Sequence, residues 1–594
     1  MPARLIRPAA GALLAGLVAL VAFTGAQAQQ ATDSVAPETG ASRSENRLVT
    51  AKNQMVVAAH PQAAAAGMAM LEKGGTAADA MVAVQLVLGL VEPQSSGLGG
   101  GAFLLYHDGE SGKLTTYDGR ETAPMAADGK LFIGADGEPM KFFDAVIGGR
   151  SVGTPATVAL LAEAHRRHGK LDWAELFEPA IALAEAGFTV TPRLNESIAD
   201  NAESLFRYPA TRQYFFSEEG VPIFPGTVLK NQAYADTLRA IAGEGEKAFY
   251  SGEIASDIVN VIQSAEGNPG LLTMADMADY RVKERPPVCL SYRETEICGM
   301  GPPSSGMLTI GQILGMLEEH DLAALGPESP ESWRLIGEAS RLAFADRGRY
   351  MADSDFVKMP EGLLNRSYLG DRAKLLKTED GGPKTLPQND VQPGEPPMDH
   401  AFLHADDRSL ELPSTSHFSI IDRFGNAVSM TTTIENAFGS RLMVRGFLLN
   451  NELTDFSFVP EFAGRPVANR VEPGKRTRSS MAPTIVYRDG KPWLLIGSPG
   501  GSRIIGYVAK TLIAAIDWGM DVQAAISLPH LVNRFGTYDV EGGTEAEALA
   551  PALADFGYRV ESRALNSGLH GIMVTAEGLS GGADPRREGV ALGD

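Results

Sequence analysis

The residues best suited to covalent chemistry are two threonines, Thr415 and Thr433, on neighbouring segments with strand-like composition. Arg423-Phe424-Gly425 joins the segments and fits a three-residue hairpin loop with glycine at its left-handed third position. A hairpin centred on Phe424 places Thr415 directly opposite Thr433, and such residues have Cβ atoms about 4.5–5.5 Å apart. Two hydroxyls are thereby brought together, although on this geometry alone an ordinary threonine-rich strand pair is the simpler interpretation.

A glycine pair downstream, Gly500-Gly501, adds groups that can stabilise negative charge. The predicted strand at 493–496 ends in Gly-Ser-Pro-Gly-Gly-Ser-Arg, residues 497–503, just before a predicted helix. Successive backbone N–H groups at the start of a helix form a natural cradle for an anion or an oxyanion. This motif favours acyl chemistry over the plain strand-pair interpretation.

Other short motifs do not support a cofactor or a metal. The glycine run at 97–101 follows a predicted helix and precedes a predicted strand, the reverse of a dinucleotide fingerprint, so a tight turn or close backbone approach explains it better. His165 and His168 lack a matching carboxylate or cysteine set, and we expect them on the exposed face of a basic helix. These motifs therefore give no reason to expect a bound cofactor or metal.

The elements that position these groups can be predicted from apolar spacing. From His60 to Val91 the spacing is helical, and Thr76 is a suitable N-cap for a second helix over 77–91. Further elements are predicted as a strand at 102–106 and helices within 154–187, 331–352 and 506–526. Residues 377–414 are rich in proline, glycine and charge, which predicts a linker. The chain is thus α+β, and its character changes where this linker ends.

Composition excludes several classes of protein. The 594 residues include 73 acidic and 52 basic side chains, a net charge of −21, whereas surfaces for nucleic acid or anionic membrane need a basic footprint. Apolar residues make up 44%, which is enough for a large core. We expect two to four units or one multilayer domain, with no nucleic-acid partner.

The N-terminus has the pattern of a secretory signal peptide. Arg4 and Arg7 precede an apolar run that ends near Gly25, and Ala-Gln-Ala at 26–28 is a small-residue cleavage site. The run is at the short limit for a membrane span, so we expect removal of 1–28 and no membrane anchor. The mature chain is then exported, with the periplasm favoured over secretion to the medium.

Two cysteines, Cys289 and Cys298, leave two interpretations open. A hairpin with a two-residue turn at Arg293-Glu294 would place them directly opposite, and an oxidising compartment would permit a disulfide. That turn contains no glycine or asparagine, so two buried free thiols are equally compatible with the sequence.

Several motifs occur in one order along nearly the whole mature chain. They are the helical region 60–103 ending in Gly-Gly-Gly, Gly-Arg-Glu-Thr-Ala-Pro at 119–124, Pro-Pro-Ser-Ser-Gly at 302–306, Thr-Ser-His at 415–417, Leu-Asn-Asn-Glu-Leu-Thr-Asp-Phe at 449–456, Ser-Ser-Met at 479–481, and the glycine-rich segment 497–503. Together they resemble the γ-glutamyltranspeptidase (glutathione hydrolase) family of the N-terminal nucleophile hydrolase superfamily.

The resemblance implies a fold and a maturation step. The fold is a four-layer αββα sandwich of two mainly antiparallel sheets between helical layers. Precursors of this family cut themselves before a threonine, here at the Ser414–Thr415 bond, within a cleavable region at 377–414. The large fragment 29–414 and the small fragment 415–594 then remain together as a heterodimer. Cleavage frees the α-amine of Thr415, and an α-amine, with a reference pKa of about 7.7–8.0, is a suitable base for the adjacent hydroxyl.

The resemblance also implies a role for each site residue. Catalysis would involve Thr415 as nucleophile, Thr433 as its hydrogen-bonding neighbour, and Gly500 and Gly501 as the oxyanion hole. Substrate binding would involve Arg120, Ser479 and Ser480 on the α-carboxylate, and Glu435, Glu452 and Asp455 on the α-ammonium. The implied donors are glutathione and other γ-glutamyl compounds, the acceptors are water, amino acids or peptides, and no cofactor or metal is implied.

The segment before Ser479 departs from the usual pattern of the family. Thr477-Arg478 stands where Pro-Leu is usual, which places an additional cation beside the expected pocket. Residues 455–479 also contain no tyrosine, which some members use in a lid over the substrate.

Two other functions are compatible with the scaffold. One is a related acylase that takes glutaryl or cephalosporin-type side chains, and the other is an inactive periplasmic binding protein. Arg120, Glu452 and Asp455 favour the γ-glutamyl hypothesis, because together they complement both charges on the α-carbon of a γ-glutamyl group.

Overall fold

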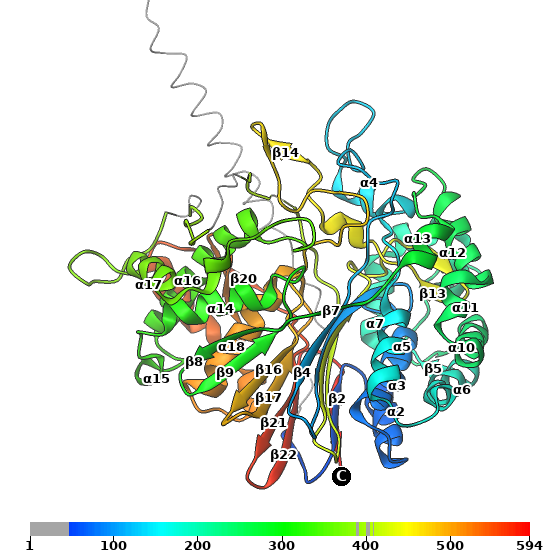
Figure 1. Ribbon diagram of the computed structural model, residues 1–594, viewed down its shortest axis with the longest axis horizontal. Coiled ribbons are helices and arrows are strands. Elements are labelled where there is room, and N and C mark those ends of the chain that lie inside the picture. The colour runs from blue at the N-terminus through cyan, green and yellow to red at the C-terminus, as the bar shows by residue number, and fades with distance from the viewer. Residues whose placement is uncertain (1–46, 388–390, 399–403, 408) are drawn as a thin grey trace, which may run out of the picture.

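Two seven-stranded sheets lie face to face at the centre of the molecule, with helices on the outer face of each (Figure 1). The computed structural model describes residues 47–387, 391–398, 404–407 and 409–594. The predicted signal peptide at 1–28 lies outside these residues, as do parts of the predicted linker. In the described parts of the chain, no helix has the length and apolar character needed to cross a membrane.

The strand order interleaves segments that are far apart in the sequence. Sheet 1 has the order β1 (Val49–Ala51), β22 (Gly578–Ala583), β21 (His570–Thr575), β17 (Lys491–Gly497), β16 (Thr484–Arg488), β9 (Thr295–Gly299), β8 (Val288–Tyr292). Sheet 2 has the order β23 (Val590–Gly593), β2 (Met55–Ala58), β10 (Ser416–Ile421), β11 (Ala427–Thr433), β3 (Gly101–His107), β4 (Leu114–Gly119), β7 (Lys283–Arg285). All neighbouring strands within the two sheets are antiparallel.

Helices form the two outer layers. The layer on sheet 2 includes α2 (Pro61–Glu72), α3 (Ala77–Val91), α5 (Thr157–His168), α6 (Glu178–Ala186) and α10 (Gln232–Glu244), and the layer on sheet 1 includes α14 (Gly306–Leu317), α16 (Pro330–Tyr350), α18 (Ile504–Ile516) and α19 (Val522–Ser527). The predicted four-layer αββα architecture is confirmed. The helix predicted over 77–91 has these bounds, and Thr76 and Asp79 form a capping box at its start.

Smaller elements surround the four layers. They are α4 (Phe142–Val146), α7 (Pro192–Asp200), α8 (Ala202–Phe206), α9 (Pro209–Phe215), α11 (Glu246–Ser251), α12 (Glu253–Gln263), α13 (Met274–Asp279), α15 (Leu322–Leu325), α17 (Arg366–Ala373) and α20 (Ala550–Asp555), with minor strands β5 (Phe188–Thr189), β6 (Val228–Leu229), β12 (Met443–Val444), β13 (Phe447–Leu448), β14 (Glu461–Phe462), β15 (Arg465–Pro466), β18 (Leu531–Asn533), β19 (Thr537–Glu541) and β20 (Arg559–Arg563).

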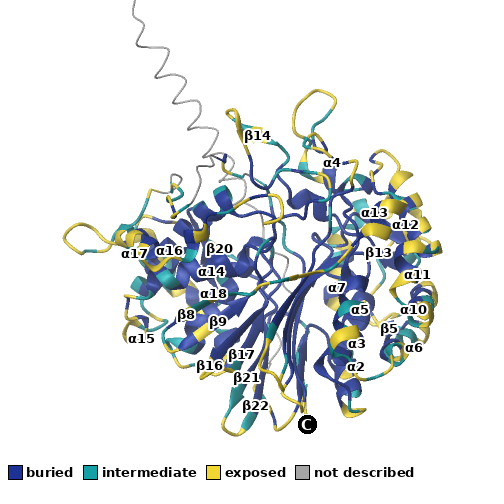
Figure 2. Ribbon diagram, viewed as in Figure 1, coloured by how far each residue is buried: buried dark blue, intermediate teal, exposed yellow. Residues whose placement is uncertain are grey.

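Alternation of side chains along the strands builds two cores. Val56 of β2 and Phe418 of β10 belong to the core beneath the helices of sheet 2, whereas Val57 and Ile421 belong to the core shared with sheet 1. Successive side chains of a strand point to opposite faces, so each of these strands contributes to both cores. The pairing register of the strand sets which side chains enter which core. Figure 2 shows the resulting pattern: the sheets are buried, and exposed residues gather on the outer helices and loops.

Both sides of the expected cleavage point contribute to both sheets. In sheet 2, β10 lies between β2, which precedes residue 414, and β11, which follows it. In sheet 1, β16 lies between β17 and β9, again one partner from each side. The two fragments that the resemblance implies would therefore build both sheets jointly.

Two details of the predicted local structure are settled. Cys289 and Cys298 pair in register across β8 and β9 and form a disulfide, and Arg293 takes a positive φ of 52° in the turn between the strands.

The expectation that His165 and His168 are exposed is wrong. The ring of His168 stacks on Tyr106 at 3.8 Å between centroids, and Nε2 of His165 lies 2.9 Å from the Leu171 carbonyl oxygen.

The glycine run at 97–101 allows main chains to approach closely. A Cβ on Gly100 would overlap the carbonyl oxygen of Thr433, and one on Gly99 would overlap that of Leu448. The close-approach interpretation of this run is therefore confirmed, and the run sets the position of the strand end that carries Thr433.

We expect Gly100→Ala to lower the free energy of unfolding by about 1–3 kcal/mol, because the new methyl group forces the Thr433 backbone to shift. Urea unfolding, with both proteins held as uncut chains, measures the change. Gly243→Ala is the control: in α10 its Cβ would have no neighbour within 4 Å, so the gain in helix propensity should raise stability by up to about 1 kcal/mol. Equal stability of wild type and Gly100→Ala would contradict the close-approach argument.

Candidate active site

Thr415 precedes β10 at the point where the hairpin brings it beside Thr433. Ser416 pairs with Thr432, and the loop between the strands contains Gly425 with a φ of 82°. The hydroxyl oxygens of Thr415 and Thr433 are 3.3 Å apart. The predicted register and the predicted meeting of two hydroxyls are therefore both confirmed.

The carbonyl of Ser414 lies under both hydroxyls. Thr415 Oγ1 donates a short hydrogen bond to this carbonyl oxygen, and Thr433 Oγ1 donates another at 3.3 Å. The backbone N–H of Glu435 donates to Thr433 Oγ1 at 2.8 Å, which orients that hydroxyl. The Ser414–Thr415 peptide bond is thus next to a nucleophilic oxygen, and a second hydroxyl polarises its carbonyl.

The other side of Thr415 is held by a buried arginine from the C-terminal part of the chain. Arg587 Nη1 donates to the Thr415 carbonyl oxygen at 3.1 Å. The hydroxyl of the next residue, Ser416, donates to buried Glu92 at 2.7 Å. These contacts, together with the strand ladder, fix the main chain at Thr415 and Ser416.

One end of the site carries a buried arginine surrounded by carboxyl groups. Arg120 follows β4 and forms ion pairs with Glu452 and, at 2.5 Å, with Asp455. Both acids lie on a single 3₁₀ turn, Glu452–Asp455, so one short element supplies both partners. Glu435 accepts a short hydrogen bond from Asn451 at the start of that turn.

Burial raises the pKa values of the carboxyl groups at this end. It raises the pKa of Glu121 to about 8, and it raises those of Glu435, Glu452 and Asp455 well above their usual range. Mutual repulsion contributes, while Arg120 opposes the shift in each case. Four carboxyl groups thus surround one guanidinium and share protons among themselves. Because carboxyl groups outnumber cations here, binding of an additional cation is favoured.

The predicted site residues are gathered around one small cavity. Its lining includes nine of the ten predicted residues, namely Arg120, Thr415, Thr433, Glu435, Glu452, Asp455, Ser479, Ser480 and Gly501. Gly500, with a φ of 133°, adjoins Gly501 and does not itself line the cavity. The volume is about 20 Å³, and Glu411, Leu412 and Ser414 of the preceding segment also line the cavity.

Sequence reasoning missed three charged residues of this region. Glu411 lies within the predicted linker, and Arg347 lies inside a predicted helix. Glu121 directly follows Arg120, to which a role was already assigned. Glu411 accepts a hydrogen bond from Ser480 at 2.6 Å and forms an ion pair with Arg347 at 2.5 Å. No local pattern marks these residues, because each finds its partners through the fold.

Comparisons with known proteins agree with this geometry. Residues 63–594 match the model of the gamma-glutamyltranspeptidase family. A glutathione hydrolase proenzyme of Bacillus subtilis (strain 168) is 36% identical over 555 residues, which cover 91% of this chain and 92% of that protein. A glutathione hydrolase proenzyme of Escherichia coli (strain K12) is 35% identical over 549 residues, 91% of each chain. The solved structure of a cephalosporin acylase from Bacillus halodurans matches with a TM-score of 0.81 at 26% identity, over 94% of this chain and 99% of that one.

The raised pKa of Glu121 predicts a pH-dependent stability. Between about pH 4.5, the reference value, and about pH 8, the folded state keeps a proton that the unfolded state releases, so stability falls as pH rises through this window. Glu121→Gln should lack this loss of stability. Across the window, the free energy of unfolding of the wild type should fall by at least about 1.4 kcal/mol more than that of Glu121→Gln, the equivalent of one pKa unit. Urea unfolding of the uncut chains across pH 4–9 tests this. The exposed Glu138→Gln controls for the lost charge, and parallel profiles for wild type and Glu121→Gln would refute the assignment.

Proposed function

The chain belongs to the gamma-glutamyltranspeptidase family, and on that basis we propose that it is a self-cleaving precursor of a γ-glutamyltransferase and glutathione hydrolase. One observation carries the proposal: the Thr415 hydroxyl and a charged end made of Arg120, Glu452 and Asp455 line the same cavity. A γ-glutamyl group needs a nucleophile at one end and complements for an α-ammonium and an α-carboxylate at the other. This cavity supplies both.

Self-cleavage begins with attack of Thr415 Oγ1 on the Ser414 carbonyl carbon. The C–N bond to Thr415 breaks, the hydroxyl proton passes to the leaving nitrogen, and Ser414 becomes esterified to the threonine oxygen. Water then hydrolyses the ester, which releases a Ser414 carboxylate, the Thr415 hydroxyl and a free α-amine. The short hydrogen bond from Thr415 to the Ser414 carbonyl and the second contact from Thr433 support this step.

Turnover repeats the same chemistry on an external amide. The α-amine of Thr415 accepts the hydroxyl proton as Oγ1 attacks the γ-carbonyl carbon, and it delivers that proton to the departing amine. The γ-glutamyl ester then transfers to water, in hydrolysis, or to the amine of an amino acid or peptide. The backbone N–H groups of Gly500 and Gly501 are assigned to the oxyanion of each tetrahedral intermediate.

The charged groups of the cavity are assigned to the head of the substrate. Glu435, Glu452 and Asp455 take the α-ammonium, whose charge the surplus of carboxyl groups favours. Arg120, Ser479 and Ser480 are assigned to the α-carboxylate. Removal of one of these charges leaves its partner buried and unpaired, which costs roughly 2–5 kcal/mol.

A related acylase is the second candidate, because the matching structure from Bacillus halodurans is described as a cephalosporin acylase. Glutaryl-type substrates lack the α-ammonium. The cluster of Glu435, Glu452 and Asp455 would then have no cation to bind beyond Arg120, which favours the γ-glutamyl assignment.

The cellular setting is also part of the proposal. A cleaved signal peptide at 1–28 would release the protein to the periplasm, where the Cys289–Cys298 disulfide can form and persist. The fragments 29–414 and 415–594 would remain together, because their strands alternate in both sheets.

We expect wild type to yield a fragment that begins at Thr415, and Thr415→Ala to remain one uncut chain without turnover. Thr433→Ala should cut at least about tenfold more slowly, because the hydroxyl that polarises the Ser414 carbonyl is lost. Intact mass and N-terminal sequencing measure both. Thr575→Ala is the control and should be cleaved normally, because it removes a hairpin hydroxyl that donates to the Gly578 carbonyl and accepts from the Glu577 N–H. A Thr415→Ala variant that is still cleaved and active would contradict the assignment of Thr415 as the nucleophile.

The choice of donor separates the candidate functions. We expect kcat/KM for γ-glutamyl-4-nitroanilide to exceed that for glutaryl-4-nitroanilide by at least about thirtyfold, the equivalent of about 2 kcal/mol for an unpaired buried charge. Equal rates would support the acylase. Glutathione binding in a calorimeter without turnover of either anilide would instead support an inactive binding protein.

A further inference from the structure

The glycine-rich segment 497–503 ends in two buried residues that the proposed function does not use, Ser502 and Arg503. Each is 2% exposed. They directly follow Gly500 and Gly501, whose backbone N–H groups are assigned to the oxyanion, and residues 501–503 form one 3₁₀ turn that leads into α18. The contacts that hold Ser502 and Arg503 therefore also hold the turn that carries these N–H groups.

The two glycines alone do not fix this turn. Gly500 and Gly501 have φ values of 133° and 57°. Because glycine has many accessible backbone conformations, two successive glycines make a flexible turn unless their neighbours restrain them. N–H donors stabilise an oxyanion best when they are held in place before the charge develops. The turn therefore needs restraints from other elements of the fold.

The first restraint is a buried ion pair. Nε and Nη2 of Arg503 lie 2.9 and 2.7 Å from one carboxylate oxygen of Asp539, in the middle of β19. Asp539 is itself 2% exposed. Hydrogen bonds between ionised groups are stronger than those between neutral groups, and the planar guanidinium makes them directional. Arg503 is therefore attached to β19 as well as to its own helix.

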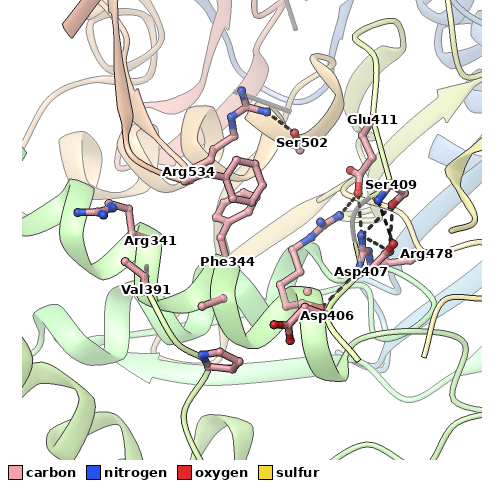
Figure 3. A pocket seen from close by; sticks show the side chains of 15 residues that line it. Arg341, Phe344, Val391, Asp406, Asp407, Ser409, Glu411, Arg478, Ser502 and Arg534 are labelled. Carbon is pink, nitrogen blue, oxygen red and sulfur yellow. Dashed lines mark hydrogen bonds and ion pairs between the residues drawn. The ribbon is translucent and has the colours of Figure 1, made fainter. Parts of the chain in front are cut away.

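The second restraint reaches the hydroxyl of Ser502. Arg534, the residue after β18, donates a hydrogen bond from Nη1 to Ser502 Oγ at 2.6 Å (Figure 3). Nη2 of Arg534 lies 4.0 Å from the Asp539 oxygen that accepts from Arg503. Asp539 thus attracts two arginines, one that belongs to the turn and one that binds it.

Asp539 is itself held by a small sheet. β18, β19 and β20 form this three-stranded sheet apart from the two central ones, and β18 packs against α18. A Cβ on Gly506 of α18 would lie 3.0 Å from the side chain of Val532 in β18. Nε of Arg563, from β20, lies 3.1 Å from the second oxygen of Asp539. The carboxylate is thus fixed from behind while it holds the turn in front.

Resting on the proposed function, we propose that Asp539 is a positioning residue for the oxyanion hole. It acts through its ion pair with Arg503 and through Arg534. These contacts hold the backbone N–H groups of Gly500 and Gly501 where the γ-carbonyl oxygen of the donor gains charge. The small sheet then serves as a rigid support for one part of the active site.

Self-cleavage should not depend on this support. In the uncut chain, the carbonyl oxygen of Ser414 accepts a hydrogen bond from Thr433. Gly501 lies instead against Leu412, whose carbonyl oxygen would be 2.7 Å from a Cβ on that glycine. The support by Asp539 is therefore specific to turnover of an external donor.

Two possible effects of Asp539 predict opposite changes in rate. Loss of its charge alone would leave the arginines unopposed, and the more positive potential behind the glycines would stabilise an oxyanion and raise kcat. Loss of a restraint would instead lower kcat, because even a small misplacement of catalytic donors is costly. The sign of the change therefore separates positioning from a simple field effect.

Kinetics of Asp539→Asn test the proposal. On fully cleaved protein with γ-glutamyl-4-nitroanilide, we expect kcat to fall at least about fivefold and KM to stay within about twofold, because an oxyanion forms in both acylation and deacylation. Self-cleavage, followed by intact mass, should stay within about twofold of the wild-type rate. Glu547→Gln removes a surface carboxylate that accepts from Ser562 beside the same small sheet. This variant is the control and should change neither rate.

Ser502→Ala is a second test, and it decides the matter if Asp539→Asn does not fold. It removes the hydroxyl that Arg534 binds and leaves the Asp539–Arg503 pair in place. We expect kcat to fall about threefold or more, with KM and self-cleavage unchanged. An unchanged or higher kcat in a folded variant, or equal slowing of self-cleavage and turnover, would overturn the proposal. If wild type turns over no γ-glutamyl anilide at all, the proposed function itself fails, which is distinct from a dispensable Asp539.

Discussion

A buried charge must have a partner, and this constraint organises the site around Thr415. Arg120 lies among carboxyl groups from a turn more than three hundred residues away, and Arg347 of α16 neutralises Glu411. Each pair joins segments that no local interaction would bring together. Because removal of one partner leaves an uncompensated charge in the interior, the two ends of the cavity are held in place by electrostatics as well as by packing.

The strands supply what the charges cannot, namely precise placement of Thr415, the proposed nucleophile. The hairpin of β10 and β11 sets the distance between Thr415 and Thr433, and Gly100 lets a neighbouring main chain approach Thr433 closely. Backbone geometry thus fixes the two hydroxyls, while ion pairs shape the cavity that is proposed to receive the substrate. Glu411, Leu412 and Ser414 of the preceding segment line the same cavity as Thr415 and the charged groups.

The features that could be predicted from the sequence are mostly local. A three-residue loop determines the Thr415–Thr433 pairing, and a capping box marks the start of α3, so both follow from neighbouring residues. The layer order and the roles of the site residues came from the family resemblance. The contacts of Glu411 with Arg347 and Ser480 could not be predicted, because a linker glutamate carries no signal for a partner 64 or 69 residues away. Arg478 looked anomalous in the sequence, and its carboxylate partners became apparent only in the folded chain.

The interleaved strand order has a consequence for the life of the molecule. Neither of the two fragments in the proposed function contains the neighbours that its own central strands require, so a two-chain product would lack the covalent connection that guided its assembly. After denaturation, two separate chains would have to find each other and thread alternate strands into both sheets, a bimolecular search with long-range pairing. The mature protein would then persist through a high barrier to unfolding more than through a refolding equilibrium, which makes it kinetically stable and a one-time product of its precursor.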